Sequence, residues 1–159
     1  MQGLDLVHDP HLARLPERIF VLAEIFFREG VDVPVGPLLA DALHAARANA
    51  TDSQAALRAV AHAFIQFAND NPALFDAMFI RATTLRFAAA DTPPELTAAF
   101  AQLREAVRAV AGERDVDTLT EVLWAALHGL TTLARSGRLR PEYESERVDL
   151  LTAHFSGVS

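Results

Sequence analysis

The sequence predicts a single all-α domain, a bundle of about six to seven helices. Runs that alternate apolar and polar β-branched residues, as strands do, are absent, and Ala, Leu, Arg and Glu dominate, all of which favour helices. Proline and glycine divide the chain into segments of helix length joined by short connections, as in packed helical bundles. The 159 residues suit one domain.

Helix start and stop signals place each element in order. Proline is favoured at the first helical position, Ser, Thr or Asp just before it, and glycine just past the helix end. The helix near residue 116 has two candidate caps, Asp115 and Asp117. Together these signals predict helices over residues 16–29, 37–49 and 52–69, a fourth from Pro72, and then 93–111, 116–136 and 141–156.

Composition excludes several classes of function. The chain has no cysteine, so disulfides, zinc-thiolate sites and thiol catalysis are ruled out. No phosphate loop, zinc-protease motif or nucleophile elbow is present, and we expect neither enzyme activity nor a cofactor. His8 and His11 are metal-ligating residue types, but their terminal position favours a solvated tail, and no metal site is expected.

The chain also lacks sequence signals for export or membrane insertion. No cationic segment followed by an apolar one opens it, and charges interrupt every apolar stretch well before about 20 residues. We therefore expect a cytoplasmic protein that does not span a membrane. The net charge is −7, which disfavours contact with phosphate backbones unless basic residues gather on one face.

The helix predicted over residues 116–136 is the most informative segment. Trp124 and His128 are four residues apart and therefore share a face, and Gly129 interrupts a helix interior, where it costs up to about 1 kcal/mol relative to alanine. A second, apolar stripe runs along the same helix. A helix with two occupied faces lies between two partners, so we expect one face to close the core and the other to meet a second subunit.

Three stretches of this chain resemble one known family. Trp124, His128 and Gly129 match the signature of the so-called WHG subgroup of TetR-type transcriptional regulators, in their C-terminal regulatory domain. Residues 67–79, FANDNPALFDAMF, are similar to the helix, break and helix that precede the family's pocket, and residues 133–139, LARSGRL, are similar to its turn between the last two helices.

The resemblance covers roughly residues 38–156 and implies a fold, a partner and a role. It implies a helical bundle around a pocket for a small, often hydrophobic, effector, and a homodimer formed by the last two helices. Residues 37–159 would be this regulatory domain. The ligand-binding candidates are apolar or aromatic: Phe64, Phe75, Met78, Phe79, Phe100, Leu103, Trp124 and His128. The dimer-interface candidates are Val122, Ala126, Gly129, Leu133, Val148, Leu151 and Phe155.

A plainer interpretation stands beside each of these candidates. Most apolar residues at helical spacing are simply core, and Trp124 and His128 could equally be a core tryptophan and a core histidine with its hydrogen bonds satisfied. Gly129 is better explained as a notch for helix packing than as a ligand contact.

The N-terminal part departs from the family. Regulators of this family carry three helices before a linker helix, whereas residues 1–36 read as an irregular segment plus one helix, without a recognition helix. Residues 1–50 hold four Arg against seven Asp or Glu. We expect no autonomous DNA binding. The alternatives are a divergent full DNA-binding repressor, or a helical interaction module that heterodimerises with a full-length regulator.

Overall fold

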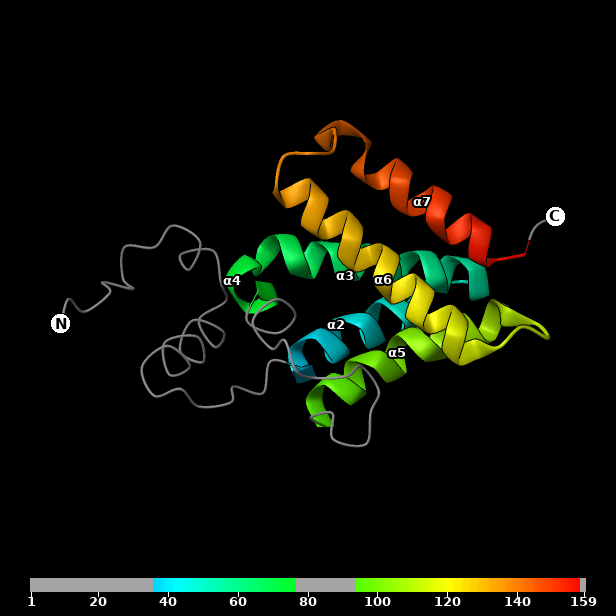
Figure 1. Ribbon diagram of the computed structural model, residues 1–159. Helices are drawn as coiled ribbons and strands as arrows, with labels where there is room; N and C mark the ends of the chain where they lie inside the picture. Colours follow the sequence, from blue (N-terminus) through cyan, green and yellow to red (C-terminus); the bar gives the residue numbers. More distant parts are fainter. Residues whose placement is uncertain (1–35, 77–93, 158–159) are drawn as a thin grey trace.

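The computed structural model describes residues 36–76 and 94–157 (Figure 1). Within these ranges every regular element is helical, which confirms the predicted all-α class. The predicted helix over 16–29, His8 and His11, and the candidates Met78 and Phe79 lie outside the described residues. The elements are α2 (Gly36–Ala48), α3 (Ser53–Asp70), α4 (Pro72–Phe75), α5 (Pro94–Ala111), α6 (Val116–Arg135), the 3-10 turn η4 (Pro141–Tyr143) and α7 (Glu144–Phe155).

Capping residues begin the helices where the sequence predicts. The Asp52 carboxylate accepts a hydrogen bond from the Ala55 backbone N–H at 2.8 Å, so α3 starts after it. Asp115, not Asp117, caps α6, because its carboxylate accepts from the Thr118 N–H at 2.8 Å. Each bond satisfies a backbone donor that has no partner within the helix.

Glycines end two of these helices. Gly112 and Gly137 have φ of 59° and 70°, in the left-handed region that favours glycine. After Gly137, the backbone N–H of Arg138 donates to the Leu133 carbonyl at 2.9 Å and closes the end of α6. This bond holds Arg138 beside Leu133.

Helix α3 is the centre of the bundle (Figure 1). It contacts α2, α4, α5, α6 and α7, and α2 and α5 pack against each other beneath it. In Figure 1, α2 and α5 lie below α3 and α7 lies above it. None of the described helices is long and apolar enough to cross a membrane. The core is made mainly of large aliphatic and aromatic side chains: Leu39, Leu43, Leu57, Val60, Phe64, Leu103, Val107, Leu123 and Leu127.

Helix α7 packs mainly on α3 and makes few direct contacts with α6. The predicted helix over 141–156 begins as the turn η4 and becomes α-helical only at Glu144. Arg58 on α3 donates to both carboxylate oxygens of Asp149 on α7, at 2.6 and 2.7 Å. The His62 ring Nε2 lies 2.8 Å from the same carboxylate. This ion-pair cluster ties the last helix to the central one.

The Asp149 cluster predicts an acid-sensitive component of stability. The hydrogen bond with His62, and then the Arg58 pair, hold the pKa of Asp149 below its ordinary value. A carboxylate with a depressed folded-state pKa stabilises the fold above its unfolded pKa of about 3.9, and this contribution disappears as the pH falls through the folded value. Because the pair is partly exposed, we expect it to contribute about 0.5–1 kcal/mol.

Denaturant unfolding from pH 7 down to pH 2 tests this expectation. Asp149→Asn should lower the free energy of unfolding at pH 7 and flatten its decline below about pH 4. Glu146→Gln, on the same helix and without an ion pair to another described residue, is the matched control and should follow the wild type. Parallel curves for wild type and Asp149→Asn would contradict the assignment.

Candidate functional site

Four of the predicted ligand-binding residues form one aromatic cluster, which we define as Phe64, Phe75, Trp124 and His128. The Phe64 and Phe75 rings meet edge to face, with centroids 5.9 Å apart. The His128 ring stacks on Phe75 at 5.5 Å, and Trp124 lies 5.4 Å from His128. Edge-to-face and offset contacts of this kind are the favoured aromatic geometries. The cluster joins α3, α4 and α6.

The aromatic cluster has a buried end and an accessible end. Phe64 and Phe75 are each 1% exposed, whereas Trp124 and His128 are half-buried. Both half-buried rings come from α6, four residues apart on one face, as the sequence predicted. The accessible part of the cluster is therefore supplied by a single helix.

An ion pair closes the cluster at the C-terminal end of α6. The Arg135 guanidinium donates to both oxygens of Asp76 at 2.6 and 2.9 Å, and its central carbon lies 5.8 Å from the Phe75 ring centroid. Both side chains are partly exposed, at 27% and 36%. The pair fixes α6 to the residue directly after α4, and it covers one ring of the cluster with a cation.

Burial sets the charge state of the histidine in the cluster. It lowers the pKa of His128 below its ordinary value of 6.5. The imidazole is therefore predominantly neutral at neutral pH, with one nitrogen able to donate a hydrogen bond and the other able to accept one. The accessible end of the cluster thus presents rings without a formal charge.

The other ligand candidates divide into two groups. Phe100 and Leu103 are buried on α5, at 8% and 1% exposure, and Leu103 belongs to the main core. Met78 and Phe79 follow α4 and lie outside the described residues. The ligand-binding role of all these residues stays a prediction.

The outer face of α6 carries four of the seven predicted interface residues. Val122 is 53% exposed and Leu133 is 38% exposed, and Ala126 and Gly129 between them are half-buried. A β-carbon added at Gly129 would meet no described atom within 4 Å outside its own helix backbone and chain neighbours. Packing within the described part of the subunit therefore does not account for this glycine.

The three interface candidates on α7 lie differently from the prediction. Val148 and Phe155 are 1% and 8% exposed and belong to the subunit's own core, and Leu151 packs against that core while partly buried. They fill the space between α7 and α3. The side chains that α7 and η4 leave exposed are Leu150, at 56%, and Tyr143, at 37%.

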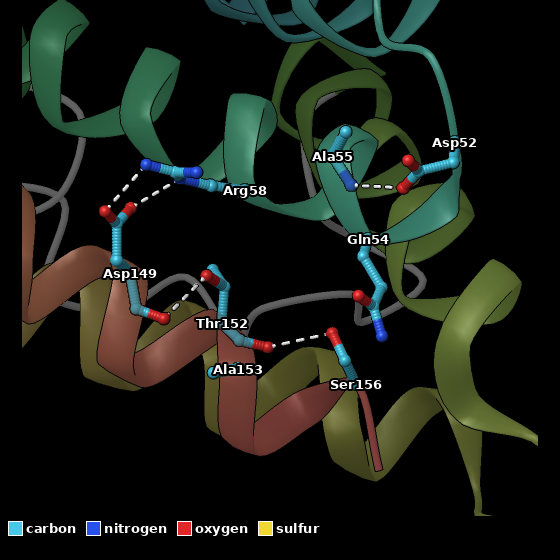
Figure 2. A pocket seen from close by; sticks show the side chains of 8 residues that line it. All are labelled: Asp52, Gln54, Ala55, Arg58, Asp149, Thr152, Ala153 and Ser156. Atoms are coloured by element: carbon cyan, nitrogen blue, oxygen red, sulfur yellow. Dashed lines mark hydrogen bonds and ion pairs between the residues drawn. The ribbon is translucent and has the colours of Figure 1, made fainter. Parts of the chain in front are cut away.

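A groove of about 350 Å³ lies between the start of α3 and α7, and Figure 2 shows the side chains that line it. Its charged groups are already committed, since Arg58 pairs with Asp149 and Asp52 caps α3. The hydroxyls of Thr152 and Ser156 donate to carbonyls of their own helix. The groove contains none of the predicted ligand or interface residues, and we do not assign it a ligand.

Sequence reasoning missed the polar groups that organise these surfaces. Thr120 and Thr131 are fully buried on α6, where their hydroxyls donate to the carbonyls four residues earlier. The Arg135–Asp76 pair joins residues 59 apart in the sequence, and no local pattern signals it. Among the described residues, no group of three or more His, Asp or Glu side chains gathers as a metal site would require.

Comparison with known proteins gives one family match. A family model described as "Tetracyclin repressor-like, C-terminal domain" matches residues 57–155. The matched region runs from α3 to the end of α7 and includes the whole aromatic cluster. No curated protein and no solved structure matches significantly. The match covers more than half of the chain, and with its all-helical fold the chain belongs to the family of tetracyclin repressor-like C-terminal domains.

Proposed function

We propose that this chain is the effector-binding and dimerisation domain of a TetR-type regulator, and that its effector is a small apolar molecule. Family membership implies a regulatory domain. The observation that supports a ligand at this place is the aromatic cluster, in which two buried rings lead to two half-buried rings on α6. Sites for small molecules are mostly apolar, with few polar groups that fix orientation.

The chemistry of the cluster favours an uncharged ligand. A neutral His128 carries no formal charge, and the half-buried rings of Trp124 and His128 present apolar area. A charged ligand would lose hydration here, and the cation beside the cluster, Arg135, already pairs with Asp76. Met78 and Phe79, which follow α4 in the chain, are proposed to complete the site.

Helix α6 provides a physical route from this site to a second subunit. Trp124 and His128 lie on one side of the helix, and Val122, Gly129 and Leu133 lie on its outer face. A ligand that binds better to one arrangement of α6 shifts the population toward that arrangement. The resulting change reaches the dimer interface without any intermediate element.

The chain's single tryptophan, Trp124, offers a direct test of ligand binding. We expect the neutral apolar dye N-phenyl-1-naphthylamine to quench tryptophan emission saturably. His128→Glu, which buries a carboxylate in the cluster, should weaken binding by about tenfold or more. Tyr143→Phe, on the exposed turn η4, is the control and should bind as the wild type does. Equal affinity in a folded His128→Glu variant would contradict the site.

The dimer forms, in this proposal, through the outer face of α6. We expect the wild type to sediment as a dimer. Leu133→Glu should weaken association by about tenfold or more, because a twofold interface buries the new carboxylate twice. Ala109→Glu, on the exposed face of α5, is the matched control and should leave the dimer intact. A Leu133→Glu dimer of unchanged affinity would exclude this face.

We also propose that the chain does not bind DNA on its own. Residues 1–50 carry four Arg and seven acidic residues, a balance opposite to that of a phosphate-binding head. In gel-shift assays, the chain should show no sequence-specific, salt-sensitive complex. Tight binding that weakens steeply between 50 and 200 mM salt, as expected of proteins with several phosphate contacts, would favour a divergent repressor instead.

A further inference from the structure

We propose that the α6 helices of two subunits pair antiparallel, and that Glu121 of each subunit forms an ion pair with Arg138 of the other. This inference rests on the proposed dimer and adds its register and the charges that fix it. Three observations on α6 and the turn after it carry this inference: an exposed stripe that is complementary to itself, opposite charges at the two ends, and two of those charges without a partner side chain among the described residues.

The exposed stripe consists of Val122, Ala126, Gly129 and Leu133, spaced four, three and four residues apart. This heptad-like spacing keeps one seam facing a partner helix. The centre of the stripe lies midway between Ala126 and Gly129, so reversing the helix direction superposes the stripe on itself. Val122 then faces the partner's Leu133, and Ala126 faces the partner's Gly129.

Side-chain size along the stripe agrees with this pairing. The small residues Ala126 and Gly129 lie at the centre, where two backbones can approach closely, and the larger Val122 and Leu133 lie toward the ends. The empty space around the Gly129 α-carbon within its own described subunit leaves room for such an approach. A partner helix supplies the packing that would offset the cost of glycine in a helix interior.

Charge selects the antiparallel direction over the parallel one. The start of α6 is acidic, with Asp115, Asp117 and Glu121 exposed. Its end and the turn that follows are basic, with Arg135 at the end and Arg138 and Arg140 exposed after it. Parallel pairing would place like charges together at both ends. Antiparallel pairing places each acidic end beside a basic one, and it also opposes the two helix dipoles.

Two of these charges are uncommitted within the described part of the subunit. Asp117 accepts from Arg104, and Arg135 pairs with Asp76. Asp115 caps the helix, and the Arg140 guanidinium lies over the Tyr143 ring at 4.1 Å. By contrast, the side chains of Glu121 and Arg138 form no hydrogen bond or ion pair with another described residue.

The proposed register brings these two side chains within reach. Glu121 directly precedes Val122, and the backbone hydrogen bond from Arg138 to Leu133 holds Arg138 beside the residue that faces the partner's Val122. In the antiparallel register, Glu121 and the partner's Arg138 therefore both flank the contact between Val122 and the partner's Leu133. Both have long side chains, which can extend toward each other across this contact.

Charge reversal tests the pairing. We expect Glu121→Arg and Arg138→Glu each to weaken the homodimer about tenfold in low salt, because each brings like charges together twice. An equimolar mixture of the two variants should restore dimers of near wild-type affinity, since both contacts are then complementary. Analytical ultracentrifugation measures the affinities, and mass spectrometry identifies the mixed dimer.

A matched pair on α5 provides the control. Glu105 and Arg108 pair with each other within one subunit, so Glu105→Arg and Arg108→Glu should leave the dimer unchanged, alone and mixed. Circular dichroism of each variant establishes that it is folded. In 0.5 M salt, the loss of dimer affinity in the single variants and its recovery in the mixture should both be smaller, because exposed charges are screened.

The outcomes separate this inference from the proposed function. A monomeric wild type would overturn both. A wild-type dimer that tolerates either reversal, or a mixture no tighter than the single variants, would overturn the register and leave the dimer standing. Selective formation of the mixed dimer would support the Glu121–Arg138 contact.

Discussion

Burial of one narrow face of α6 fixes where every other side chain of that helix points. Leu123 and Leu127 are fully buried, and Thr120 and Thr131 extend this face by one turn in each direction. Because successive residues of a helix are about 100° apart, anchoring this face places Trp124 and His128 on one flank and Val122 and Leu133 outside. The aromatic cluster and the exposed stripe are two consequences of a single packing constraint.

Buried threonines make that constraint more specific than an all-leucine face would be. Their hydroxyls donate to carbonyls within α6, so they enter the core without an unsatisfied donor. They are also smaller than leucine, so the two ends of the buried face fill less volume than its middle. The sequence pattern of apolar residues could not identify this face, because two of its four buried residues are threonines, which such a pattern does not count.

Local signals in the sequence predicted the helices and their ends well. They did not predict which residues far apart in the sequence form pairs. Asp52, Gly112 and Gly137 mark helix ends through bonds and backbone angles that involve only near neighbours. The Arg58–Asp149 pair joins residues 91 apart, and it depends on how α7 lies on α3. No periodicity within either helix contains that information.

The predicted interface residues on helix α7 show the same limit of local sequence patterns. Val148, Leu151 and Phe155 are spaced three and four residues apart, and this spacing indicates one apolar face without naming what covers it. This spacing predicts an apolar face, which we assigned to a subunit interface. In the structure, Val148 and Phe155 instead complete the subunit's own core beside α3. The outward position of Leu150 follows from this, since it is two residues from Val148 and therefore on another side of the helix.

The placement of α7 bears on how a ligand signal would travel. Because α7 is tied to α3 through Asp149 and makes few contacts with α6, movement of α6 need not carry α7 with it. Helix α6 is tied to the residue after α4 through the ion pair between Arg135 and Asp76, at the end of α6 nearest Phe75. At its start, α6 is tied to α5 through Arg104 and Asp117. A ligand against Trp124 and His128 would therefore act on the middle of a helix that is held at both ends. In the antiparallel pair proposed here, a rotation of α6 about its own axis would move the exposed stripe and the Glu121 contact to the partner's Arg138 together.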